Sequence, residues 1–255
     1  MKIGLALSGG GIRGVAHLGV IKALEENGIS ISAVSGTSAG AIAGAFYASG
    51  YSVDRILEIV LDIKTTRFIQ LALSWKGVLK MDAIHKFLAQ YMPRDSFEAL
   101  EIPLYIAATN IKTGTTEYFS KGPLTPAICA SSCIPVLFDP VAFNDKLYID
   151  GGMLNNLPVE PVKETCDLVI ASHSNPIDRQ YEPKNARDVM ERSLMLAITC
   201  NVYSRKSLCD YFIEPQGLGS FKVLDVNKAE EIYKIGYEQT LKFLDQTDLK
   251  SKLGK

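Results

Sequence analysis

A serine flanked by glycines is the first feature of this sequence that could do chemistry. Gly36, Ser38 and Gly40 fit the pattern GxSxG, between an apolar stretch at 31–35 and an alanine-rich stretch at 39–49. A strand, a tight turn and a helix in this order form a nucleophile elbow, in which flanking glycines let the turn expose the serine oxygen. We therefore expect Ser38 to be a nucleophile, with Gly36 and Gly40 as elbow residues. The alternative is a small-residue turn without chemistry.

A glycine-rich loop follows an apolar run at 3–7 and precedes a helical pattern. It comprises Gly9, Gly10, Gly11, Ile12, Arg13 and Gly14. Backbone amides at the start of a helix hold an anion, because they lie at the positive end of the helix dipole. That anion is a phosphate or the oxyanion of a tetrahedral acyl intermediate, and the loop alone does not choose between them.

The same loop matches the GxGxxG pattern of dinucleotide-binding proteins. Such a site needs an acidic residue about 20 positions further on to bind the ribose, or an arginine for a 2′-phosphate. Residues 29–40 contain no Asp, Glu or Arg. A nucleotide site is therefore disfavoured, and a non-catalytic anion- or nucleotide-binding module remains the alternative to an enzyme.

A serine nucleophile also needs a base to accept its proton. Asp150 ends an apolar run at 146–149 and is followed by Gly151 and Gly152, which let the chain turn sharply. A carboxylate at the end of a strand is well placed to meet Ser38 at the edge of a sheet. An ordinary Asp-Gly turn is the alternative.

Only three histidines could serve as a base instead. His17 and His85 lie among apolar residues of helical patterns, and we expect both to be mostly buried and hydrogen-bonded. His173 follows an apolar run, and the chain order Ser38, Asp150, His173 is that of an α/β-hydrolase triad. Order does not establish a triad, because geometry defines one.

Strand and helix patterns alternate along the chain, which predicts a mostly parallel sheet covered by helices. The expected strands lie at 3–7, 31–35, 102–109, 146–149, 168–172 and 211–214. The expected helices lie at 13–27, 39–49, 53–63, 82–91, 125–131, 186–206 and 229–244. With 255 residues and no repeat or linker, we expect a single domain over residues 1–255.

Composition limits the classes of partner and compartment. The formal net charge is −1, so there is no basic field for nucleic acid. Five cysteines without metal-ligand spacing indicate free thiols in a reducing compartment. No apolar run reaches the ~18 residues of a membrane span. We expect a cytoplasmic protein, with peripheral membrane contact at most.

An apolar segment at 67–75 contains the only tryptophan, Trp75. One interpretation is an acyl-chain wall or a flap that contacts a membrane, since access to lipids needs exposed apolar surface. The other interpretation, a segment that covers the core, has equal support.

Taken together, these motifs resemble the patatin-like phospholipase family. The matching segments are the glycine loop at 9–14, the GxSxG motif at 36–40, the Asp-Gly-Gly motif at 150–152, an Ala-Ser-x-x-x-Pro block at 130–135 and Asn-Asn-Leu-Pro at 155–158. The resemblance covers about residues 3–175, and the last 80 residues add little to it. Ser8 departs from the family, in which many members have Asp at this position.

The resemblance implies a three-layer α/β/α fold and hydrolysis of lipid acyl esters without a metal or cofactor. It also implies a Ser38–Asp150 dyad without histidine, an oxyanion held by the amides of Gly10, Gly11 and Ile12, and an Arg13 that fixes the loop. Because a free Asp has a pKa of about 3.9, we expect a half-buried Asp150 with a raised pKa beside Ser38. The alternative enzyme is an esterase or thioesterase in which His173 completes a triad.

Overall fold

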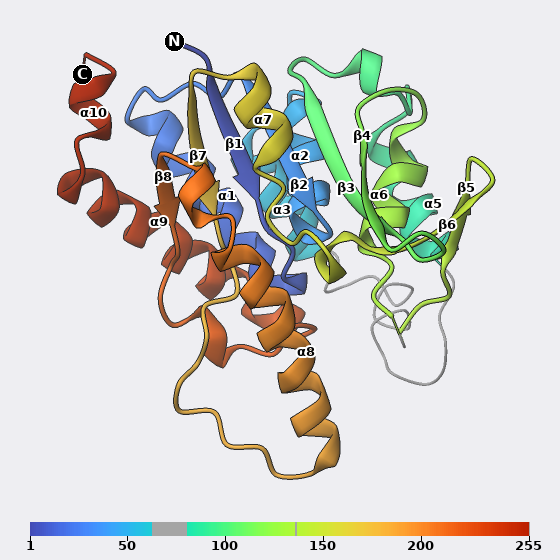
Figure 1. Cartoon of the computed structure of the whole chain (residues 1–255). Helices are drawn as coiled ribbons and strands as arrows, with labels where there is room; N and C mark the ends of the chain where they lie inside the picture. The colour runs from blue at the N-terminus through green and yellow to red at the C-terminus, as the bar shows by residue number, and fades with distance from the viewer. Residues whose placement is uncertain (63–80, 136, 255) are drawn as a thin grey trace.

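The computed structural model describes residues 1–62, 81–135 and 137–254 (Figure 1). The apolar segment at 67–75 lies outside these residues. Within the described ranges, no helix is both long and apolar enough to cross a membrane.

A mixed sheet forms the centre of the fold, and its strands are ordered β5-β6-β3-β2-β1-β7-β8, with β4 also paired to β3. The strands are β1 (Ile3–Leu7), β2 (Ala33–Thr37), β3 (Leu104–Asn110), β4 (Thr115–Phe119), β5 (Val141–Phe143), β6 (Lys146–Asp150), β7 (Leu168–Ser172) and β8 (Tyr211–Ile213). The strands β3, β2, β1, β7 and β8 are parallel, whereas β4, β5 and β6 pair in antiparallel fashion.

Burial explains which strands could be read from the sequence. Every residue of β1, β2 and β7 is buried, because a parallel sheet is covered on both faces and its strands are continuous apolar runs. The predictions at 3–7 and 168–172 are confirmed. Strand β2 starts two residues later than predicted and continues to Thr37, so Ser38 follows the strand directly.

Helices cover both faces of the sheet (Figure 1). They are α1 (Ala16–Glu26), α2 (Ala39–Ala48), α3 (Val53–Asp62), α5 (Asp82–Tyr91), α6 (Leu124–Ser132), α7 (Glu160–Thr165), α8 (Ala186–Tyr203), α9 (Ala229–Gln246) and α10 (Leu249–Lys252). A 3₁₀ turn over Gly11–Val15 precedes α1.

Two of the apolar clusters among the described residues lie on opposite faces of the sheet. Leu5 and Leu7 of β1 pack into the larger core with residues of α1, α2, α3 and α9. Ala6, which points to the opposite face, packs with Val162 of α7 and Val202 of α8. The predicted three-layer α/β/α class with a mostly parallel sheet is therefore confirmed.

Helices α1 and α9 cross at a pair of glycines. A Cβ at Gly19 would lie 2.3 Å from the carbonyl oxygen of Tyr233 and 2.5 Å from the amide nitrogen of Tyr237. A Cβ at Gly236 would lie 2.2 Å from the carbonyl oxygen of Ala16. Since the obstacles are backbone atoms, neither site can admit a side chain without moving a helix.

We predict that Gly19→Ala and Gly236→Ala each lower the free energy of unfolding by about 1–3 kcal/mol, through overpacking of the helix crossing. At a solvent-exposed position in a helix, Gly→Ala instead raises the free energy of unfolding by up to ~1 kcal/mol. The sign of the change therefore shows whether the two helices are in close contact. Urea unfolding followed by circular dichroism measures it. Either variant being as stable as the wild type would contradict the close crossing.

Candidate active site

Strand β3 brings the ends of β2 and β6 together. Strand β2 pairs with β3 up to Thr37, opposite Ala107, and β6 pairs with β3 from Asp150, opposite the next residue, Ala108. Strand β4 occupies the other edge of β3 over the same stretch. Strands β2 and β6 therefore lie end to end along one edge of β3, and their carboxyl ends meet at Ser38 and Asp150.

Ser38 forms a strained elbow between β2 and α2. Its backbone has φ 53° and ψ −119°, a conformation that residues other than glycine rarely adopt. The Ser38 amide donates a hydrogen bond to Ser131 Oγ at 2.8 Å, and Ser131 Oγ donates to the carbonyl oxygen of Ala107 at 2.6 Å. The hydroxyl of Ser131, from α6, thus ties the elbow to β3. The sequence resemblance included Ser131 but did not predict this role.

The flanking glycines leave no room for side chains. A Cβ at Gly36 would lie 2.4 Å from the carbonyl oxygen of Gly40, and a Cβ at Gly40 would lie 2.4 Å from that of Leu7. Both glycines are therefore required for the close approach of β1, β2 and the first turn of α2.

Asp150 is buried, with 7% of its surface exposed, which is more than the expected half burial. Burial raises the pKa of its carboxyl to about 6, although the Gly152 amide and the Ser38 hydroxyl both lower it by interacting with the charged form. The amide of Gly152 donates to Asp150 Oδ1 at 2.8 Å. The structure thus brings Ser38 and Asp150 together and gives the carboxylate an affinity for protons near neutral pH.

Only part of the glycine loop is free to bind an anion. The Gly9 amide donates to Asn156, the Ile12 amide donates to the carbonyl oxygen of Val223 at 2.9 Å, and the Arg13 amide donates to that of Gly10. The prediction that Ile12 contributes its amide is therefore wrong, and Gly9 is excluded in the same way. Within residues 1–62, 81–135 and 137–254, the amides of Gly10 and Gly11 have no acceptor.

Gly14, at the end of the glycine motif, serves packing. A Cβ at this position would lie 2.6 Å from the Cβ of Ala39, the first residue of α2. The close contact holds the 3₁₀ turn of the loop against the helix that begins beside Ser38.

Arg13 fixes the loop to the C-terminal part of the chain. Its Nε donates to the carbonyl oxygen of Phe221 at 2.9 Å and its Nη2 to that of Gly219 at 3.0 Å, while Nη1 donates to Asn175 Oδ1 at 3.3 Å. Burial lowers its pKa to about 10, so the guanidinium stays charged at neutral pH. Residues 219–223, which lie outside the stretch that carries the family resemblance, thus accept hydrogen bonds from the loop.

Asn156 joins the glycine loop to the Asp150 turn. Its side-chain Oδ1 accepts from the Gly9 backbone amide at 3.1 Å, and its backbone amide donates to Asn201 Oδ1 at 2.9 Å. Asn201 Nδ2 in turn donates to the carbonyl oxygen of Gly152 at 3.0 Å. The sequence offered only a motif match for Asn156 and no signal for Asn201, because both contacts depend on tertiary structure.

Neither His17 nor His85 contacts Ser38 in the described part of the chain. His17 is buried as predicted and bridges Ser172 Oγ and the carbonyl oxygen of Ser8, each at 2.8 Å; burial lowers its pKa to about 4. The prediction that His85 is mostly buried is wrong, because its side chain on α5 is exposed. The predicted hydrogen bond is present, between His85 Nε2 and Thr125 Oγ1 at 3.2 Å.

His173 is buried at the end of β7, away from the nucleophile. Its Nδ1 lies 2.9 Å from Glu214 Oε1, and its ring packs against Tyr203 and Phe212. In the described part of the chain it makes no contact with Ser38. The chain order suggested that His173 joins Ser38 and Asp150, but its partner in the structure is Glu214.

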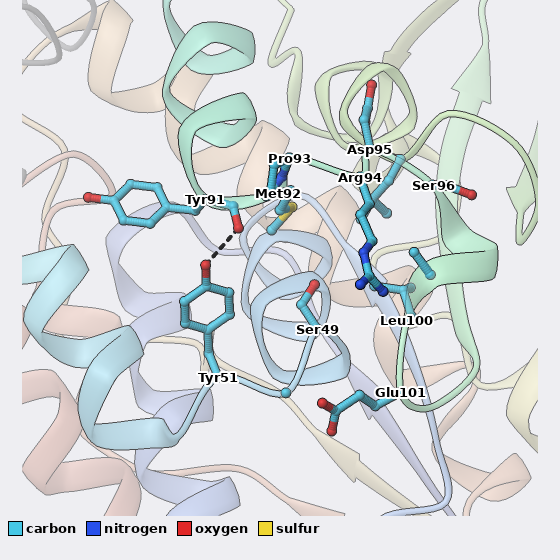
Figure 2. Close-up of a pocket in the computed structure, with 13 residues that line it drawn as sticks. Ser49, Tyr51, Tyr91, Met92, Pro93, Arg94, Asp95, Ser96, Leu100 and Glu101 are labelled. Atoms are coloured by element: carbon cyan, nitrogen blue, oxygen red, sulfur yellow. Dashed lines mark hydrogen bonds between the residues drawn. The ribbon is translucent and has the colours of Figure 1, made fainter.

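A separate cavity of about 370 Å³ lies at the other end of α2 (Figure 2). Tyr51, Tyr91, Arg94 and Glu101 are among the residues that line it. Since α2 begins beside Ser38 and ends at Ala48, the cavity lies about 15 Å from the elbow. It is therefore separate from the place where Ser38 and Asp150 meet.

Comparison with known proteins identifies the family. The model of the patatin-like phospholipase family matches residues 5–163, which include the glycine loop, the elbow and the Asp150 turn. The chain belongs to the patatin-like phospholipase family.

Relatives extend the likeness to the C-terminal part. An uncharacterized NTE family protein of Mycobacterium tuberculosis is 32% identical over 218 residues, covering 82% of this chain and 60% of the relative. Lysophospholipase NTE1 of Kluyveromyces lactis is 29% identical over 284 residues, covering 98% of this chain and 20% of that protein. This chain thus spans three fifths or less of the length of these relatives.

Among solved structures, VipD from Legionella pneumophila resembles this fold with a TM-score of 0.55 and 18% identity. The match covers 96% of this chain and 67% of VipD. At this identity the likeness concerns the fold alone.

We predict that Asp150→Asn stabilises the protein and that the gain grows with pH. The unfolded carboxyl ionises near its ordinary pKa of 3.8 and the folded one near about 6. Ionisation therefore favours the unfolded chain, and wild-type stability falls as pH rises from about 4 to 6. Urea unfolding at pH 4 and pH 7.5 measures the gain, which should be up to about 3 kcal/mol larger at the higher pH. A gain independent of pH would contradict the raised pKa.

Proposed function

We propose that this chain is a serine-dependent lipid acyl hydrolase of the phospholipase A or esterase type. It cleaves carboxylic esters through an acyl-Ser38 intermediate, with Ser38 and Asp150 as a catalytic dyad. The observation that carries the proposal is a buried carboxylate with a pKa of about 6, next to a serine in a strained elbow. Family membership and the lysophospholipase name of the Kluyveromyces lactis relative support a lipid ester as substrate.

The acylation step uses Asp150 as the base. The carboxylate accepts the proton of Ser38 Oγ while the oxygen attacks the ester carbonyl carbon. A base with a pKa of about 6 is ionised at neutral pH yet accepts a proton more readily than an ordinary carboxylate. Asp150 then returns the proton to the leaving alcohol.

Gly10 and Gly11 supply the charge stabilisation. Their free amides donate to the oxyanion of the tetrahedral intermediate, and Gly14 packing against Ala39 fixes their distance from Ser38. In deacylation, water attacks the acyl carbon while Asp150 accepts its proton. The bond from the acyl carbon to Ser38 Oγ then breaks, Asp150 returns the proton to Ser38 Oγ, and the carboxylic acid leaves. Every step runs on groups of this chain.

The rival triad has weaker support. A triad needs a histidine that contacts the nucleophile, whereas His173 contacts Glu214. A non-catalytic anion-binding module would leave the strained geometry of Ser38 without a purpose, since backbone strain persists where function needs it.

We predict that a fluorophosphonate probe labels the wild type at Ser38 and that Ser38→Ala abolishes the labelling. Asp150→Asn should reduce hydrolysis of a short-chain ester by roughly 10³–10⁴-fold, because the serine loses its base. His173→Ala serves as the matched control and should keep near wild-type activity. A comparable loss in His173→Ala would favour the triad, and labelling that survives Ser38→Ala would refute the nucleophile.

We also predict that kcat/KM for a soluble ester rises with pH through an apparent pKa near 6 and is then level. The sign follows from the mechanism, since Asp150 acts as a base only when ionised, which requires a pH above its pKa of about 6. A stopped assay from pH 4.5 to 8 gives the profile. Activity that falls with pH over this range would contradict a carboxylate base.

A further inference from the structure

The exposed side chains that the structure describes on helix α8 are all uncharged. Among the α8 residues whose side chains the structure describes, the exposed ones are Ala186, Val189, Met190, Ser193, Leu196, Ala197, Cys200 and Tyr203. A surface helix of a globular protein normally turns its charged residues to solvent and its apolar residues to the core. This apolar face of α8 therefore indicates an interaction surface.

The apolar face is continuous along the helix. Val189, Leu196 and Tyr203 are seven residues apart, so they align along one side over about 21 Å. Their exposed fractions are 50%, 41% and 39%, and that of the neighbouring Met190 is 57%. Arg192 lies outside this line, half-buried, and donates to the carbonyl oxygen of Asp178.

One end of this face lies at the catalytic edge, by which we mean the sheet edge where Ser38 and Asp150 meet. Asn201 in the last turn of α8 bonds to Gly152 and Asn156, next to Asp150. Leu154 in the same turn of chain is 38% exposed. From this anchor, α8 projects beyond the carboxyl ends of the strands (Figure 1). A surface that docks on α8 is therefore brought to the edge where Ser38 and Asp150 meet.

The charge near this face indicates which kind of membrane surface it would bind. Residues 174–203 contain four acidic and four basic residues, so this segment has no net charge. A helix that binds anionic membranes carries an excess of Lys and Arg beside its apolar side. Tyr203 at the end of the face donates a hydrogen bond to the Glu214 carboxylate. The other described residues of the face are uncharged, and together with the zero net charge of the segment they instead complement the interface of a zwitterionic lipid bilayer.

We propose that the apolar face of α8 docks on the surface of a zwitterionic lipid bilayer and holds the catalytic edge against it. The inference rests on the proposed function, because a lipid substrate resides in such a surface. Val189, Met190 and Leu196 enter the interfacial region, and Asn201 couples the docked helix to the Asp150 turn.

The test measures binding of the Ser38→Ala protein to phosphatidylcholine vesicles by flotation, so that hydrolysis cannot alter the vesicles. The double substitution Val189→Ser and Leu196→Ser should weaken partitioning by at least about tenfold, since two apolar side chains no longer leave water. Ser193→Leu, on the same face, should strengthen it. Ile111→Ser removes an equally exposed side chain from the turn after β3 and is the matched control, with no expected change.

Several results would overturn the proposal. They are absence of binding to phosphatidylcholine, binding that requires anionic lipid or is lost in 0.5 M salt (about a 4–5 Å screening length), and an equal loss in Ile111→Ser. A dimer that the double substitution dissociates would assign the face to a second copy of the chain. Hydrolysis of a soluble ester by the same variants with Ser38 intact should be unchanged. If the wild type does not hydrolyse the soluble ester, the proposed function is refuted. Binding of the Ser38→Ala protein to vesicles would then still be a valid result.

Discussion

The edge of β3 that is shared by β2 and β6 is the constraint that brings Ser38 and Asp150 together. Thr37 pairs with Ala107 and Asp150 with the adjacent Ala108, so two strands that run in opposite directions end against each other. Neither Ser38 nor Asp150 is held by a long loop. A slip of one residue in either strand would turn the affected side chain to the other face of the sheet. The register of the sheet thus sets the distance between the two groups.

Burial of Asp150 is the second requirement, and it couples stability to chemistry. The same desolvation that raises its pKa to about 6 makes the ionised form costly in the folded protein. The hydrogen bond from the Gly152 amide offsets part of that cost. In the proposed mechanism, the raised pKa of Asp150 makes it a base suited to neutral pH. It thereby takes the role that a histidine has in other serine hydrolases.

A network of hydrogen bonds between side chains and backbone atoms joins the glycine loop to the Asp150 turn. Asn156 binds Gly9 on one side and, through Asn201, Gly152 on the other. Arg13 ties the loop to the carbonyl oxygens of residues 219–221. Asn156 occupies the Gly9 amide, and the carbonyl oxygen of Val223 occupies the Ile12 amide. Within the described residues the amides of Gly10 and Gly11 have no acceptor, and the proposed mechanism uses these two for the oxyanion.

The sequence predicts this fold well where the physical demand is local. Buried parallel strands are continuous apolar runs, and a turn without room for a Cβ requires glycine, so β1, β7 and the glycine motifs could be recognised. Strand β4 was missed because it is half-exposed and lacks such a run. The partners of Ile12 and Ser38 were missed because Val223 and Ser131 are about 211 and 93 residues away in the chain, and pairing at that distance is a property of the tertiary fold.

The central claim is that Ser38 and Asp150 act together at an oxyanion site made by Gly10 and Gly11. A crystal structure of the protein after reaction with a fluorophosphonate tests it most directly. The account predicts a phosphonyl group on Ser38 Oγ, a phosphonyl oxygen within hydrogen-bond distance of both amides, and Asp150 beside the adduct with His173 still on Glu214. An adduct on another residue, or His173 in contact with phosphonylated Ser38, would contradict it.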